Sequence, residues 1–364
     1  MIRALWSRFS IALLSAPVIA AAAACGGTSH GRGAATQGSG GSAQPLAGKT
    51  INLVSSGAAG SSHDLFARAL APALAKYLHA TVHVVDMPGG GQLLAWNYVY
   101  GSSPDGLTIG TVDVEGILAN LWEKVPNNNV NPAKVTMLGG LAGGTTGESE
   151  VMFAANSTNP VFSNVYSLVK DRSVKVRELG SVGDVPGPLL FKLYHVPYTD
   201  LTAYSDSSAE LQGMIRGDGN VSVKSWAGSW AAYVTGGKGK VLLAFSMRPT
   251  WQEDPSVPTV AQLLKKDPIS GPGRVAEVAD STALDAGTGI FGPPGMPAAT
   301  VKALRAAVAY AVSQPSFKSA AVKGSLSTTF ESAADETAAI QAGVKPQTIA
   351  IMRKYVPLST GVAS

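Results

Sequence analysis

The feature that most constrains the fold is a repeated order of strand, glycine loop and helix between residues 50 and 111. The apolar run Thr50 to Val54 is typical of a buried strand, and periodic apolar residues predict a helix from about Ser62 to Leu78. Strands from Thr81 to Val85 and from Leu107 to Thr111 flank a second predicted helix, Leu93 to Tyr100. Strands that alternate with helices predict a parallel sheet with right-handed crossovers.

The first loop, Gly57 to Ser61, joins a predicted strand end to a helix start, which is where ligands bind in such sheets. Glycines let the backbone approach a ligand closely, and the N–H groups at the helix start can hold an anion without a basic side chain. The alternative is a tight turn with Ser61 as the N-cap and Asp64 as its capping-box partner. The spacing alone leaves both interpretations open.

Length and charge narrow the class of protein. A chain of 364 residues, 45% hydrophobic and 14% charged, can bury a sizeable core and suggests about two domains. Of its 28 lysines and arginines, Arg3 and Arg8 lie in a predicted export signal, which leaves 26 basic against 24 acidic residues. This balance does not indicate a nucleic-acid partner.

The N-terminus predicts export. Arg3 and Arg8 precede an apolar run from Ile11 to Ala24, so residues 1–24 are predicted to be a signal peptide. Cys25, the only cysteine, follows directly and resembles the lipidated cysteine of bacterial lipoproteins; the alternative is ordinary cleavage with an incidental thiol. Residues 25–47 would then be a flexible Gly/Ser-rich tether. We expect a protein anchored at the outer face of the cytoplasmic membrane, or periplasmic.

Several motifs, in order and spacing, resemble the substrate-binding receptors of tripartite tricarboxylate transporters. They are GAAGSSHDLFAR at 57–68, VVDMPGGG at 84–91, SPDGLTIGT at 103–111, ELGSVG at 178–183, HVPY at 195–198, GKVLLA at 239–244 and GIFGPPGMP at 289–297. The resemblance implies an α/β, bilobal type II periplasmic-binding-protein fold, with two parallel-type mixed sheets flanked by helices. It also implies a first lobe of residues 48–141 plus 247–364 and a second of 142–246. Two hinge segments would cross between them, near 139–150 and 242–246.

The same resemblance implies a carboxylate site made largely of backbone amides and hydroxyls. Its positions in this chain are Gly60, Ser61, Ser62, Asp64, Gly89, Gly90, Gly91 and Thr111 in the first lobe, with Gly180 and Ser181 in the second. If Asp64 faces the ligand, its carboxylate would favour a ligand with an ammonium group. If Asp64 only caps the helix, it would not affect the choice between amino acids and plain dicarboxylates. Asp184 follows where the family has a Gly/Ser-rich run, so a dicarboxylate, tricarboxylate, amino acid or aromatic acid all stay open as ligands.

Other residues offer weaker candidates. His63 is expected to be an exposed histidine at the helix start. Trp226 and Trp230 could stack on a flat ligand, but we expect them to pack in the core or to lie on an exposed rim. His79 and His83 are separated by a predicted helix end and do not indicate a metal site. We expect no cofactor, no metal and no catalytic set. The sequence therefore predicts a non-enzymatic receptor that delivers a carboxylate to membrane transporter subunits, with a ligand sensor acting on a signalling partner as the alternative.

Overall fold

The computed structural model describes residues 45–145, 149–156, 158–180, 184–202, 204 and 207–356. The predicted signal peptide, Cys25 and most of the predicted tether lie outside the described residues, as does Ser181 of the predicted site. Within these ranges no helix combines the length and the apolar character that a membrane span requires.

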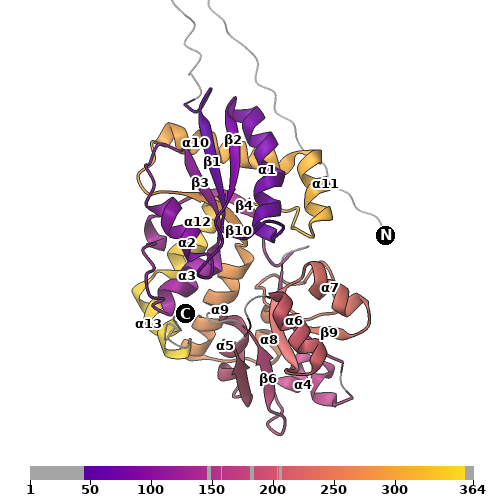
Figure 1. The fold of residues 1–364 in the computed structure, drawn as a ribbon. Coiled ribbons are helices and arrows are strands. Elements are labelled where there is room, and N and C mark those ends of the chain that lie inside the picture. Colours follow the sequence, from indigo (N-terminus) through magenta and orange to yellow (C-terminus); the bar gives the residue numbers. More distant parts are fainter. Residues whose placement is uncertain are drawn as a thin grey trace, which may run out of the picture. The chain divides into compact units, whose positions relative to one another are not determined.

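The first sheet has six strands in the order β11-β4-β10-β3-β1-β2 (Figure 1). Strands β1, β2 and β3 are parallel, as the sequence predicts, whereas β10 runs antiparallel between β3 and β4. The sheet is therefore mixed, and one of its central strands comes from the C-terminal part of the chain. The strands are β1 Thr50–Ser55, β2 Thr81–Asp86, β3 Thr108–Asp113, β4 Thr136–Leu141, β10 Thr288–Gly292 and β11 Phe330–Glu331.

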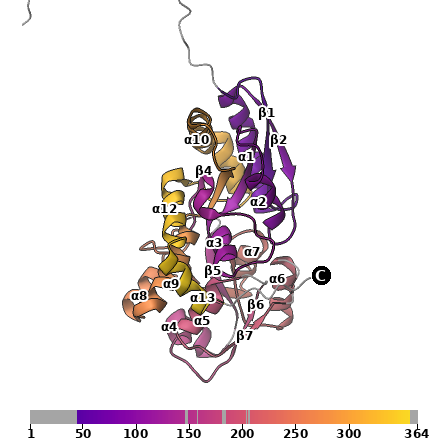
Figure 2. The same ribbon diagram turned by 90° about the vertical axis from the view of Figure 1, so that its left-hand side faces the viewer.

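Helix α1 (Ser62–Leu78) matches its predicted bounds, because its end signals are local. The Ser61 side chain accepts a hydrogen bond from the Asp64 backbone N–H, and His79 ends the helix in the left-handed conformation with φ 50°. Its apolar face packs against α10 (Ala298–Ser313), and Figures 1 and 2 show the two helices side by side. The other helices of this half are α2 Leu93–Tyr100, α3 Val114–Trp122, η1 Pro132–Lys134, α11 Pro315–Lys323, α12 Ala333–Gly343 and α13 Pro346–Tyr355.

The second sheet has five strands in the order β7-β6-β8-β5-β9. Strands β6, β7 and β8 are parallel, and β5 pairs antiparallel with both β8 and β9. The carboxyl end of β8 therefore lies beside the start of β5. The strands are β5 Glu150–Ala155, β6 Val176–Leu179, β7 Tyr198–Leu201, β8 Val221–Ser225 and β9 Gly239–Ala244, and the helices are η2 Pro160–Ser163, α4 Val165–Leu168, α5 Pro186–Leu193, α6 Ser207–Arg216, α7 Gly228–Thr235 and α8 Val260–Lys266.

The chain passes between the two sheets in two segments. The first follows β4 and precedes β5, within the predicted crossing, but the second begins later than predicted because Leu242 to Ala244 still belong to β9. Arg248 Nε donates to the Gly143 carbonyl at 3.1 Å and so joins the two crossing segments. Asp285, the last residue of α9 (Gly271–Asp285), accepts from Ser246 Oγ at 2.5 Å and from Met247 N at 2.7 Å. The predicted lobe limits stay a prediction.

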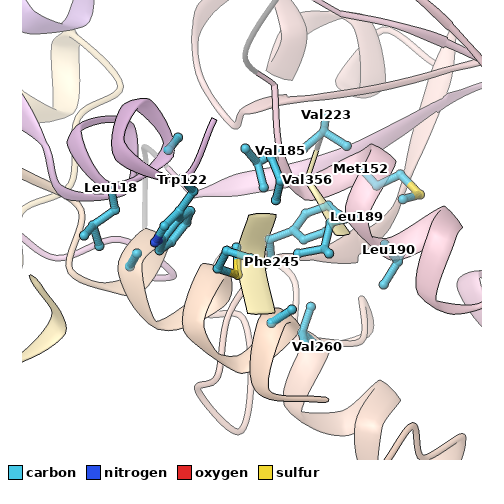
Figure 3. Close-up of a cluster of buried hydrophobic side chains, with 14 of the residues drawn as sticks. Leu118, Trp122, Met152, Val185, Leu189, Leu190, Val223, Phe245, Val260 and Val356 are labelled. Atoms are coloured by element: carbon cyan, nitrogen blue, oxygen red, sulfur yellow. The ribbon is translucent and has the colours of Figure 1, made fainter. Parts of the chain in front are cut away.

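One buried apolar cluster contains side chains from both sheets and from the helices beside them (Figure 3). Trp122 of α3, Leu189 of α5 and Val223 of β8 belong to it, and Ala276 contributes from α9. Helix α9 packs against both α3 and α5. The burial of this apolar surface stabilises the association of the elements around α9.

Candidate functional site

Ser56, directly after β1, connects the carboxyl ends of two strands to the start of α2. Its backbone N–H donates to Thr111 Oγ1 at 2.9 Å, and its hydroxyl donates to Gln92 Oε1 at 2.6 Å. Thr111 is 1% exposed, so the predicted site residue lies inside a buried hydrogen-bond network. This network brings the first glycine loop, the second glycine loop and β3 together at the carboxyl ends of the parallel strands, here called the sheet edge. A ligand site is expected at this position in an α/β sheet.

Asp113, the last residue of β3, is the charged centre of the same edge. It accepts from Gln92 Nε2 at 2.7 Å and from Thr288 Oγ1 at 2.8 Å, and it lies 3.1 Å from His63 Nε2. Burial acts to raise the pKa of Asp113, but the charge of His63 and these hydrogen bonds outweigh it and lower the pKa to about 2. The prediction of an exposed His63 is wrong: the residue is 8% exposed, because its ring turns inward to this carboxylate.

The first glycine loop is stabilised by its own polar groups. The Gly60 N–H donates to Asp64 Oδ2 at 2.8 Å, and the Ser61 N–H donates to the Ala58 carbonyl at 3.0 Å. Asp64 is 2% exposed, and its other oxygen lies 2.5 Å from Arg68 Nε. Gly60 has φ +84°, a conformation that favours glycine. The geometry thus differs from a capping box, since the Asp64 carboxylate bonds to Gly60 and not to Ser61.

The second glycine loop is exposed and lies directly before α2. Gly89, Gly90 and Gly91 have φ of 140°, 58° and 59°, and Gln92 continues in the left-handed conformation with φ 72°. Four successive residues with positive φ require a glycine-rich sequence. The loop therefore turns the chain so that Gln92 bonds to both Ser56 and Asp113.

Near the carboxyl end of β8 lie Glu150, Lys224 and Glu210, which the sequence analysis did not identify, together with Asp184. Ser225 Oγ, at the end of β8, donates to Glu150 Oε1 at 2.5 Å. Lys224 Nζ lies 2.7 Å from Asp184 Oδ2 and 3.1 Å from Glu210 Oε2. The predicted site residue Gly180 is buried beside Asp184, whose Oδ2 would lie 2.9 Å from a Cβ added at that glycine.

A charged group on the first sheet affects the pKa of a carboxyl group on the second. Burial raises the pKa of Glu150 to about 7, and the negative charge of Asp113 on the first sheet adds to this effect. Burial alone would lower the pKa of Lys224, but Asp184 and Glu210 raise it, so the lysine stays charged. Glu150 was missed because no sequence motif marks a carboxyl group at the start of an antiparallel strand.

Two tryptophans near this edge belong to the core of the second sheet. Trp226 stacks on Phe153 with ring centroids 6.0 Å apart, and Trp230 is 3% exposed with its Nε1 donating to Ser207 Oγ at 2.8 Å. The packing interpretation of these side chains is confirmed. In the part of the chain that the structure describes, no group of three or more His, Cys, Asp or Glu residues has a metal-site arrangement.

Comparison with solved structures decides the fold. A TctC solute-binding protein from Polaromonas superposes with a TM-score of 0.64 at 18% identity, covering 84% of this chain and 97% of that one. The chain has the fold of TctC-type solute-binding proteins. MatC from Rhodopseudomonas palustris with bound malate gives 0.60 at 20% identity over 83% and 99% of the two chains. An R. palustris protein with adipate gives 0.58 at 18% identity over 85% and 99%.

The fold predicted from the sequence motifs, a bilobal type II α/β fold, is thereby confirmed. No protein-family model and no curated protein sequence matches the chain. The site residues named from the resemblance stay predictions.

Proposed function

We propose that the chain is a non-enzymatic solute receptor of the tripartite tricarboxylate transporter type. It captures a small organic carboxylate between its two lobes and delivers it to the membrane subunits of the transporter. The proposed contacts are those predicted from the sequence, with Gly60, Ser61, Ser62, Asp64, Gly89, Gly90, Gly91 and Thr111 on the first lobe and Gly180 and Ser181 on the second.

The polar network at the carboxyl ends of β1 and β3 carries this proposal. Ser56, Gln92 and Thr111 connect both glycine loops, and this sheet edge is where α/β proteins of this class bind solutes. The charge of Asp113 on the first sheet adds to the raised pKa of Glu150 on the second, which supports a ligand position near both residues. The malate and adipate in the similar folds support a carboxylate as the ligand class.

We propose further that Cys25 carries a lipid anchor on the exported protein, and that residues 25–47 tether the receptor to the membrane surface. A flexible tether of this length spans roughly 25 Å on average. Such a distance lets the receptor reach membrane subunits while it stays attached.

Two measurements test the receptor function. Mass spectrometry after gentle purification is expected to identify a bound organic acid. A panel of small carboxylates at about 100 times their dissociation constants is expected to add about 2.7 kcal/mol to the free energy of unfolding. For a protein of this size the melting temperature would rise by about 5 to 10 °C.

Sugars and short peptides serve as controls in the same thermal-shift assay and are expected to leave the melting temperature unchanged. Unaltered acids must also be recovered after prolonged incubation with the receptor. Stabilisation by sugars or peptides with none by any acid, or conversion of a bound acid, contradicts the proposed function.

A further inference from the structure

Arg68, an exposed residue of α1, contacts carboxylates from two separate elements. Its Nε lies 2.5 Å from Asp64 Oδ1, one turn earlier in the same helix. Its Nη2 donates to Asp86 Oδ2 at 2.7 Å, and Asp86 is the last residue of β2, the outermost strand of the first sheet. One guanidinium group therefore connects the start of α1 to the end of β2.

Each of these two carboxylates belongs to one of the glycine loops. The other oxygen of Asp64 accepts from the Gly60 N–H at 2.8 Å, so Asp64 is bonded to the first loop. The register between β1 and β2 ends at the pair Ser55 and Asp86, and the chain continues from there into the second loop, Gly89 to Gly91. Arg68 thus links the residues from which both loops take their position.

The arginine also keeps two like charges together. Because Nε and Nη2 belong to one planar group, the carboxylates of Asp64 and Asp86 lie close to each other. Burial raises the pKa of Asp86 and the Asp64 carboxylate adds to this effect, whereas the charge of Arg68 lowers it. Asp64 is 2% exposed, so solvent screens its charge poorly. Without the guanidinium the two carboxylates would repel each other and separate the loops.

The effect of Arg68 on global stability is expected to be small. Its side chain is 50% exposed, and ion pairs made by exposed side chains contribute little to the free energy of unfolding. Its position matters locally, because a ligand held by two loops requires both in the correct relative place before it binds.

We propose that Arg68 is a positioning residue of the receptor: it holds Asp64 and Asp86 together and so fixes the two glycine loops relative to each other. This inference rests on the proposed receptor function. Arg68 acts through the two carboxylates and does not itself contact the bound acid. Removing its charge weakens binding, and removing the charge of Asp86 as well restores it.

Three variants test the inference by titration calorimetry at neutral pH. Malate, succinate, adipate and glutamate would be titrated into the parent protein, and the acid that binds most tightly would be used throughout. We expect Arg68→Gln to lower its affinity about tenfold, because the two carboxylates then repel each other. The double variant Arg68→Gln, Asp86→Asn is expected to bind within about threefold of the parent. A residue that serves only the fold would not show this recovery.

A matched control and a measurement without ligand accompany the titrations. Arg216 lies 2.6 Å from Asp218 in an exposed ion pair of α6, so Arg216→Gln should keep the parent affinity. Hydrogen exchange in the empty protein should be faster for residues 57–64 and 86–92 in Arg68→Gln and slower again in the double variant. Circular dichroism would confirm that each variant is folded.

The outcomes separate the inference from the function on which it rests. Parent affinity in a folded Arg68→Gln variant overturns the inference and leaves the receptor function standing. A loss of affinity that Asp86→Asn does not recover also overturns it, since Arg68 would then contact the acid directly. An equal loss in Arg216→Gln overturns it as well, because any surface charge would have the same effect. If none of the four acids binds the parent protein, the receptor function fails and the inference fails with it.

Discussion

Glu150 makes the stability of the empty receptor depend on pH in an unusual direction. Its pKa is about 7 in the folded protein because burial, with Asp184 and Asp113, disfavours the carboxylate, whereas an exposed glutamate in the unfolded chain titrates near 4.5. Below pH 4.5 both states are protonated, and Glu150 costs nothing. As the pH rises towards 7, the unfolded chain loses its proton first, so the free energy of unfolding falls.

The change Glu150→Gln removes this penalty and keeps an oxygen that can accept from Ser225 Oγ. A rise in pKa from 4.5 to about 7 corresponds to about 3 kcal/mol. Solvent near a partly exposed carboxyl group screens part of this effect, so we expect about 2 kcal/mol. The variant should exceed the parent by that amount at pH 8 and by well under 1 kcal/mol at pH 5, where the penalty has only begun to appear.

Urea unfolding of the ligand-free protein at pH 5 and pH 8, followed by circular dichroism, measures both values. Glu253→Gln is the matched control, since its carboxyl group is exposed and accepts from Trp226 Nε1 in a comparable way. Its effect on stability should be the same at both pH values. A Glu150→Gln variant that is destabilised equally at pH 5 and pH 8 would refute the reasoning.

Four further predictions concern the anchor, the first loop and closure. Full-length protein should partition into detergent and Cys25→Ala into the aqueous phase; a parent protein that is entirely aqueous would rule out the lipid anchor. Gly60→Val should abolish measurable ligand binding in calorimetry, since φ +84° is unfavourable for valine; parent affinity in a folded variant would refute the anion-binding loop. Asp64→Asn should lower the free energy of unfolding by about 1 to 3 kcal/mol, because it weakens the bonds to Gly60 and Arg68, and should leave the ratio of amino-carboxylate to dicarboxylate affinity unchanged; a changed ratio would mean that this side chain contacts the ligand. Small-angle scattering should give a smaller radius of gyration with ligand than without, and an unchanged radius despite tight binding would exclude a ligand that draws the lobes together.

The sequence by itself determined the local elements of the first sheet. The strand, loop and helix order from residue 50 to 111 was predictable because its signals lie within a few residues of the structure they specify. Ser61 caps the helix that follows it, and the glycines before Gln92 permit four successive positive φ angles. The motifs also indicated the fold, which the comparisons confirm.

Only the tertiary structure decided which distant residues meet. Strand β10 lies between β3 and β4 in the first sheet, so Thr288 donates a hydrogen bond to Asp113. The same carboxylate contacts the His63 ring, which is buried beside it. Asp184 and Glu210 are distant from Lys224 in the sequence and reach it only because long-range packing brings α6 beside β8. Residues close in the sequence determine backbone propensity and helix caps. Burial and Coulomb interactions instead depend on which distant residues long-range packing places next to each charged group. The charge of the site is therefore a property of the folded chain.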